Sequence, residues 1–224
     1  MAGYKFELAE ATLIALPQGG LWWQERALLC VSDLHFGKAE RIAREGGGLV
    51  PPYDTRETLS RLHGIIEVLR PEKVIALGDS FDDAHAEAAL ARDEYISLAA
   101  MMSGRHWIWI AGNHDPGPVE IGGTWRAEYR EGPLVFRHIA QSGEVSGEIS
   151  GHYHPKHRVV ASGRAVSRPA FVYDAQRVIM PAFGAYTGGM RTSDPVLAGL
   201  FGADAIAVMT GRDTVPVPLA AQPA

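Results

Sequence analysis

The sequence predicts an α/β fold built from two sheets, and two patterns support this prediction. In the first half of the chain, continuous apolar runs alternate with helical patterns, an order typical of parallel strands with helices on the faces of the sheet. In the second half, short strands follow one another closely with no convincing helix between most of them, which indicates a second, mostly antiparallel sheet. At 224 residues the chain is expected to form a single domain over residues 1–215, followed by a frayed tail over residues 216–224.

The first elements follow from local patterns along the chain. Apolar runs over residues 11–16, 21–23 and 27–31 are expected to be strands, the last two around a polar turn. Residues 37–45 place three basic residues around two apolar ones and precede a run of glycines, which predicts a mostly exposed helix.

A second helix is predicted from Asp54 or Thr55 to just before Pro71. Five apolar residues recur there at helical spacing, and either polar residue can cap the first turn, so this helix should pack on a sheet. A strand, a helix and a strand then cover residues 73–77, 87–102 and 107–111. The strands expected in the second half cover residues 134–136, 148–149, 158–160, 170–173, 177–180 and 205–209.

The composition excludes several classes of protein. Lys and Arg number 21 against 26 Asp and Glu, and the net charge of −5 excludes a globally basic nucleic-acid coat but permits a local basic patch or a metal site. Cys30 is the only cysteine, so there is no internal disulfide and a reducing compartment is expected. Because no signal-peptide pattern and no apolar stretch near the ~20 residues of a membrane-spanning helix occurs, we expect a soluble cytoplasmic protein with no membrane partner.

Polar residues that can bind a metal follow three of the predicted strands. Asp33 with His35, then Asp79, then Asn113 each come just after an apolar run. In open α/β sheets a ligand site lies beyond the carboxyl ends of the strands, so these residues should converge. Three more histidines follow later strands: His138, His152 and His154.

These seven residues supply two carboxylates, one amide oxygen and four imidazoles. A mixed nitrogen and oxygen set without thiolate suits manganese, iron or zinc rather than calcium. Seven ligands are too many for one tetrahedral ion, and they suit two ions that share a carboxylate. Two neighbouring cations can clamp a phosphoryl group and activate water, so hydrolysis of a phosphate ester is the matching reaction.

Five blocks occur in order over residues 33–154: Asp-x-His, Gly-Asp, Gly-Asn-His-Asp, a single His, and Gly-His-x-His. In this order they resemble the calcineurin-like metallophosphoesterase superfamily. The resemblance implies a four-layer αββα sandwich, in which two packed mixed β-sheets are flanked by helices. It implies that the first metal takes Asp33, His35, Asp79 and His154, and that the second takes Asp79, Asn113, His138 and His152, with Asp79 as the bridge.

The same resemblance gives roles to two further residues. His114 would not bind metal but would steady the transition state or protonate the leaving oxygen, and Asp115 would hold its ring. The acidic pair Asp82 and Asp83 is not required by the metal sites and receives no ligand role.

Three stretches, residues 33–39, 78–81 and 181–189, are similar to one bacterial branch of the superfamily, the ligase-associated DNA damage response endonucleases, or PdeM-type enzymes. This similarity implies a phosphodiesterase that nicks DNA with two Mn²⁺ ions, Zn²⁺ or Fe being alternatives. It also implies a link to DNA repair and functional association with a DNA ligase and a helicase.

Several alternatives stay open at this point. Lys38, Arg41 and Arg44 either contact DNA phosphates or form a solvated helix face. Residues 186–189 either wall the site or form a tight hairpin. The substrate is DNA or a small diester, such as a cyclic nucleotide or a nucleotide-sugar pyrophosphate. A non-catalytic scaffold is a further alternative, against which the presence of His114 and of every ligand argues.

Overall fold

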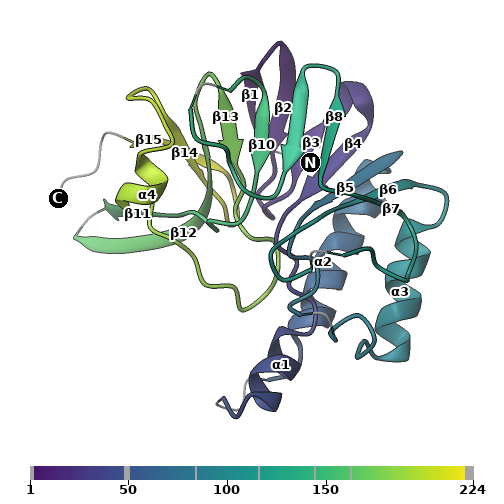
Figure 1. Cartoon of the computed structure of the whole chain (residues 1–224). Coiled ribbons are helices and arrows are strands. Elements are labelled where there is room, and N and C mark those ends of the chain that lie inside the picture. Colours follow the sequence, from purple (N-terminus) through teal and green to yellow (C-terminus); the bar gives the residue numbers. More distant parts are fainter. Residues whose placement is uncertain are drawn as a thin grey trace.

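Two β-sheets packed face to face form the centre of the protein (Figure 1). The computed structural model describes residues 3–47, 51–83, 85–115, 117–143, 145–161 and 163–219. The first sheet has its strands in chain order: β1 (Tyr4–Leu8), β2 (Ala11–Ala15), β3 (Leu21–Trp23), β4 (Leu28–Val31), β5 (Lys73–Leu77), β6 (His106–Ile110) and β7 (Thr124–Arg126). Neighbours from β1 to β4 are antiparallel and those from β4 to β7 are parallel, which confirms the parallel pairing predicted for the first half.

The second sheet runs in the order β15-β14-β12-β13-β10-β9-β8, and β11 pairs with β12 outside this order. Its strands are β8 (Glu128–Glu131), β9 (Leu134–Arg137), β10 (Glu148–Ser150), β11 (Lys156–Ala161), β12 (Arg164–Tyr173), β13 (Arg177–Ile179), β14 (Ile206–Met209) and β15 (Val215–Pro218). Most pairs are antiparallel as predicted, but β10 is parallel to both β9 and β13, so this sheet is mixed.

Helices cover the outer faces of the sheets unequally. The described helices are η1 (Gln24–Arg26), α1 (Lys38–Arg44), α2 (Asp54–Leu69), α3 (Arg92–Met102) and α4 (Pro195–Ala198). Apolar residues of α2 and α3 pack on the outer face of the first sheet, whereas α1 projects beyond it at the bottom of Figure 1. On the second sheet the helical layer is the single turn α4, which packs beside β13. None of the helices in the described ranges has the length and apolar character needed to cross a membrane.

The central strands bury both faces, which explains their uninterrupted apolar sequence. In β5, Ile75 and Leu77 face the second sheet, while Val74 and Ala76 face the helices. The same alternation puts Trp107 and Trp109 of β6 on the helical side, each at most 2% exposed. The aromatic residues of this strand therefore belong to the core.

Some boundaries differ from the predicted ones. The helix expected from residue 87 begins at Arg92, because the preceding residues form turns and Glu87 Oε1 accepts the N–H of Ile121 at 2.7 Å. The short edge strand β8 was not predicted, since its side chains are all at least partly exposed. The frayed tail was predicted from residue 216, yet Val215–Pro218 form β15 against β14; residues 220–224 lie outside the described residues.

Parallel pairing brings the carboxyl ends of β4, β5 and β6 to one edge of the first sheet. The loops that follow β4 and β5 continue side by side, because Asp33 N–H donates to Gly78 O at 3.2 Å and His35 N–H donates to Asp79 O at 3.0 Å. The first two blocks of polar residues are thus held together by the main chain.

Candidate metal centre

Two groups of potential metal ligands lie at this edge. Asp33, His35 and His154 form the first ligand group. Asp79, His138 and His152 form the second ligand group. Within each group the ligand atoms all lie within 4.8 Å of one another, so the convergence predicted from the strand ends is present.

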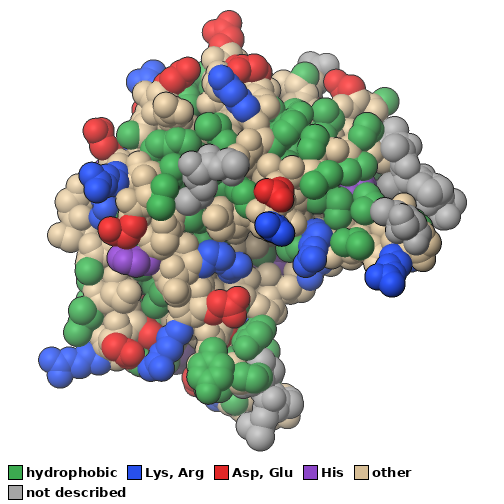
Figure 2. Space-filling view, turned by 180° about the vertical axis from the view of Figure 1, so that it is seen from behind, with side chains coloured by type: hydrophobic (Ala, Val, Ile, Leu, Met, Phe, Trp, Pro, Cys, Tyr) green, Lys and Arg blue, Asp and Glu red, His purple; other side chains and the backbone are tan. Residues whose placement is uncertain are grey.

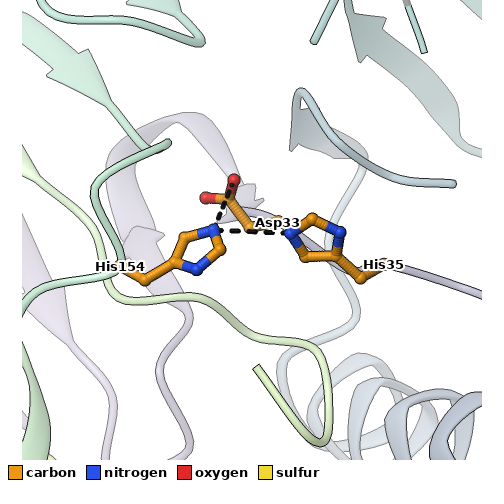
Figure 3. Close-up of side chains that lie close together, drawn as sticks. All are labelled: Asp33, His35 and His154. Carbon is orange, nitrogen blue, oxygen red and sulfur yellow. Dashed lines mark hydrogen bonds and ion pairs between the residues drawn. The ribbon is translucent and has the colours of Figure 1, made fainter. Parts of the chain in front are cut away.

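The three side chains of the first ligand group point toward one another (Figure 3). His154 Nε2 lies 3.0 Å from Asp33 Oδ1 and 3.4 Å from His35 Nε2. Asp33 Oδ2 accepts the His152 N–H at 3.1 Å, whereas Asp33 Oδ1 is buried without a well-aligned hydrogen bond among the described residues. One carboxylate oxygen is therefore fixed by the protein while the other faces two imidazoles.

The second ligand group also includes the predicted amide. Asn113 Oδ1 lies 3.0 Å from His138 Nε2 and 2.9 Å from His152 Nδ1. His138 Nε2 is also 3.4 Å from Asp79 Oδ2 and 3.3 Å from His152 Nδ1. At its other nitrogen, His138 Nδ1 donates to Leu77 O at 3.0 Å, which leaves Nε2 of the neutral ring to accept a cation.

The separations between ligand atoms fit divalent cations. Nitrogen and oxygen ligands bind zinc-like ions at about 2.0–2.2 Å, so two ligands of one ion stand roughly 3 to 3.5 Å apart. The distances in both groups fall in or near this range, and the donors are imidazole, carboxylate and amide oxygen, the set expected for manganese, iron or zinc. The residues present therefore fit two resident metal ions. Asp79 lies in the second ligand group, and its bridging role stays a prediction.

The backbone is strained where the ligands sit. Five of the predicted ligands have positive φ angles, a region that non-glycine residues rarely adopt: Asp33, His35, Asp79, His152 and His154. The glycine before Asp79 is required by packing, because a Cβ on Gly78 would lie 2.3 Å from the His138 ring. Tertiary contacts thus hold these side chains in place against local preference.

The electrostatics reflect a cluster of carboxylates and imidazoles. Burial opposes ionisation of Asp79, but its bonds to His138 and to the His114 amide outweigh burial and lower its pKa to about 2. Burial also opposes protonation of His138, yet the hydrogen bond with Asp79 and the charge of Asp33 raise its pKa to about 9. Burial and the neighbouring His138 charge lower the pKa of His152. Without metal, a proton on His138 therefore partly neutralises the acidic residues.

Comparisons with known proteins agree with this geometry. The family model for calcineurin-like phosphoesterases matches residues 27–161, which is more than half of the chain. The chain belongs to this family. Among solved structures it is similar to the nuclease MPE of Pseudomonas putida, with 26% identity, a TM-score of 0.74, and coverage of 96% of this chain and 100% of the nuclease chain. No curated protein matches the chain.

The phosphoesterase also contains a residue whose role the sequence did not reveal. Asp82 is fully buried, and its Oδ1 lies 2.7 Å from His35 Nδ1. Burial opposes its ionisation, but the bonds with His35 and Arg41 hold its pKa well below the usual range. A carboxylate behind a ligand histidine fixes the ring so that the other nitrogen faces the metal. The available signal was an acidic residue three positions after the ligand Asp79.

His114 is held differently from the prediction. Its Nδ1 donates to the backbone carbonyl of Asp82 at 2.8 Å, and its Nε2 points toward Asp79 Oδ2 at 3.9 Å. The predicted support by Asp115 is wrong. That carboxylate instead accepts N–H groups from Ser80 at 2.7 Å, Phe81 at 3.2 Å and Gly112 at 3.1 Å.

Asp115 thus ties the loop after β5 to the loop after β6. Burial raises its pKa to about 6, although two of these N–H bonds favour the ionised form. Its position is decided by main-chain donors of two loops, which local sequence does not reveal.

The basic residues of α1 contact carboxylates of the same region. Arg41 Nη1 lies 2.8 Å from Glu45, and its Nε pairs with Asp82 at 2.5 Å. Arg44 pairs with Glu40 and Asp83. The Lys38 ammonium is 3.6 Å from Asp82 Oδ1. These charges are partly neutralised by neighbouring carboxylates, and contact of Lys38, Arg41 and Arg44 with DNA stays a prediction.

The loop after β13 lies against the first ligand group. Phe183 N–H donates to Ser32 O at 2.7 Å, and Gly184 N–H donates to Asp33 O at 2.9 Å. Farther along, six residues between Gly189 and Val196 line a hollow of about 950 Å³ together with His152 and His154. Residues 183–196, which we call the wall loop, therefore lie beside the ligands, which favours the first of the two interpretations of residues 186–189.

Proposed function

We propose that the protein is a dinuclear metal-dependent phosphodiesterase that nicks DNA and acts in DNA repair. The observation that supports this most is the pair of ligand groups at one sheet edge, each with the donors and spacing of a divalent metal site. The solved structure to which the chain is similar is that of a nuclease, which favours a nucleic-acid substrate over a small diester.

The ligands divide between two cations in this proposal. The first would be held by Asp33, His35, Asp79 and His154, and the second by Asp79, Asn113, His138 and His152. When bound, two ions, Mn²⁺ in our proposal, supply positive charge to the phosphoryl oxygens and lower the pKa of water.

The remaining residues orient these ligands or take part in proton transfer to the leaving oxygen. Asp82 fixes the His35 ring, and the Leu77 carbonyl fixes the His138 ring. His114 Nδ1 donates to a carbonyl, which turns Nε2 toward the metal ligands; the ring would have to carry a second proton at Nε2 to pass one to the oxygen that leaves the phosphorus. Its side chain is 37% exposed, so substrate can reach it.

The test uses purified protein that is stripped of metal and then reloaded with Mn²⁺. We expect about two equivalents of metal per chain, nicking of supercoiled plasmid, and hydrolysis of bis(p-nitrophenyl) phosphate, all lost in EDTA. Rapid opening of a cyclic nucleotide without plasmid nicking would replace DNA by a small diester as substrate. Metal-loaded protein that hydrolyses none of these would indicate a scaffold.

The cellular part of the proposal is separate from the chemistry. We place the enzyme in the cytoplasm, in functional association with a DNA ligase and a helicase, as the resemblance to the ligase-associated branch implies. Sensitivity of a deletion strain to DNA-damaging agents, rescued by the gene, tests this part.

A further inference from the structure

The hairpin of β11 and β12 projects outward from the second sheet, at the left of Figure 1. β11 begins at Lys156, two residues after the ligand His154. Lys156 forms a parallel bridge with Arg191 of the wall loop, in which Lys156 N–H donates to Met190 O at 2.8 Å. The hairpin and the wall loop are therefore joined at the metal centre.

The strand register sorts the cations of this region onto two faces. Side chains alternate along a strand, and directly paired residues share a face. Lys156, its bridge partner Arg191, and Arg158 two residues on therefore share one face. We call these three residues the basic face. Arg168 is paired with the buried His157 and lies on the opposite face of the same hairpin.

The basic face is continuous with the metal centre. Arg191 lines the same hollow as His152 and His154. Lys156 Nζ donates to Thr187 O at 3.3 Å, and its side chain crosses Gly189, where a Cβ would lie 2.9 Å from its methylene carbons. The stronger demand for glycine here comes from the His154 carbonyl oxygen, which would lie 2.4 Å from the Cβ, and the same space lets Lys156 lie along the wall.

The charges of the basic face are available to a ligand. Arg158 and Arg191 are exposed, and within the described ranges neither has a carboxylate at ion-pair distance, in contrast to Arg41 and Arg44 of α1. One carboxylate, Asp194, lines the hollow, but its Oδ1 accepts the Val196 N–H at 2.9 Å as the cap of α4. Figure 2 shows separate Lys and Arg side chains toward the right-hand edge of the molecule seen from behind, the side on which the hairpin projects.

We propose that the basic face binds the phosphate backbone of the DNA strand on one side of the phosphate that is cleaved. This inference rests on the proposed function and adds the path that the DNA strand takes across the protein. Arg191 is placed to contact the phosphate nearest the metal centre. Lys156 and Arg158 stand about 7 Å apart along the strand, so they meet separate phosphates farther out. Because the net charge of −5 repels DNA at long range, such a local cluster is needed for binding.

The experiment compares Arg158→Glu with Arg168→Glu, a matched control on the other face of the hairpin. Both arginines are exposed and both substitutions change the net charge equally. Binding of a fluorescein-labelled DNA duplex is measured by anisotropy in EDTA between 50 and 200 mM salt. Plasmid nicking and bis(p-nitrophenyl) phosphate hydrolysis are measured with Mn²⁺.

Arg158→Glu should weaken DNA binding and nicking about tenfold and reduce the salt slope by about 1, with the small diester hydrolysed at the wild-type rate. Arg168→Glu should change each by less than about twofold. Equal losses in both variants would mean that only the net charge matters. No loss in Arg158→Glu would mean that the basic face binds another ligand, such as an acidic protein. Either result overturns the inference. A wild-type enzyme inactive on both substrates would overturn the proposed function, while the binding comparison would still decide the inference.

Discussion

The two ligand groups are held in place by different partners. In the first, His35 is backed by the side chain of Asp82 at 2.7 Å; in the second, His138 is backed by the main-chain carbonyl of Leu77 at 3.0 Å. A carboxylate makes the ligating imidazole more basic than a neutral carbonyl does, and it can be lost by substitution. We therefore expect the metal affinity of the first proposed site to depend on a side chain, and that of the second to depend on the main chain of β5.

The support of the first ligand group also extends farther. Asp82 pairs with Arg41 and lies near the Lys38 ammonium, so its negative charge is shared between His35 and α1. The Leu77 carbonyl accepts a hydrogen bond from the Ser32 hydroxyl at 3.5 Å besides the one from His138, and among the described residues it is linked to no side chain of α1. Changes on α1 should thus reach the first ligand group and spare the second.

The largest effect is expected where the two groups have a ligand in common. If Asp79 bridges both ions, Asp79→Asn weakens both sites and should reduce diester hydrolysis at least about 10³-fold. Metal content measured by plasma emission should fall well below two equivalents. Near-normal turnover with both metals retained would contradict the dinuclear arrangement.

The next largest effect is expected for His114, which lies outside both ligand groups. His114→Ala should retain whatever metal the wild type binds, because the ring is not among the proposed ligands, and should slow a diester with a poor leaving group by about 10²-fold. A nitrophenolate leaves without a proton, so bis(p-nitrophenyl) phosphate should suffer a smaller loss. Equal losses on the two substrates would indicate an electrostatic role for His114 in place of proton transfer.

Much of this site could be predicted because its ligands follow strands. The apolar runs before Asp33, Asp79 and Asn113 are recognisable, and parallel pairing brings their ends together. The supports could not be predicted in this way. Asp82 reaches His35 only because the loops after β4 and β5 run together, and Asp115 turns to main-chain donors of two loops. Such contacts depend on tertiary structure, which spacing along the chain does not encode.

The cationic residues illustrate the same limit. Lys38, Arg41 and Arg44 are candidates for phosphate contact because they follow a ligand pair in the sequence, yet two of them pair with Asp82 and the third with Asp83. The basic face could not be recognised from sequence, since it depends on the bridge between Lys156 and Arg191.

Removing the carboxylate support separates the two ligand groups. Asp82→Asn keeps the size of the side chain but loses the charge, and it should weaken metal binding at the first site by about 10- to 100-fold. The second site should bind with wild-type affinity. Isothermal titration should show two distinct affinities in the variant. A parallel loss at both sites would mean that the two groups are not supported independently.

The second ligand group should show its own dependence on pH. In the metal-free protein the pKa of His138 is about 9, so the ring carries a proton at neutral pH that a cation must displace. Affinity at this site should rise about tenfold per pH unit from about 7 and level off above 9. The stability of the metal-free fold has the opposite pH dependence. The protonated His138 ring contributes its full stabilisation below the ordinary histidine pKa of 6.5, and this contribution is lost as pH rises through 9. Calorimetric titrations with metal in buffers of different ionisation enthalpy measure the number of protons released on binding. Binding at pH 7 without proton release would contradict the prediction that His138 is protonated in the metal-free protein.

The smallest effect comes from α1. Arg41 pairs with Asp82 and with Glu45, but its side chain is partly exposed. Removing it should therefore reduce the stabilisation of the Asp82 carboxylate by no more than a surface ion pair contributes, about 0.2–1 kcal/mol. Arg41→Ala should therefore lower metal affinity at the first site by up to about fivefold. Arg44→Ala is the control, because Arg44 pairs with Glu40 and Asp83 and does not reach Asp82. If both variants bind metal as the wild type does, the Asp82 charge is set by His35 and Lys38 alone; if Arg44→Ala is the weaker binder, α1 acts on the first ligand group by another route than Asp82.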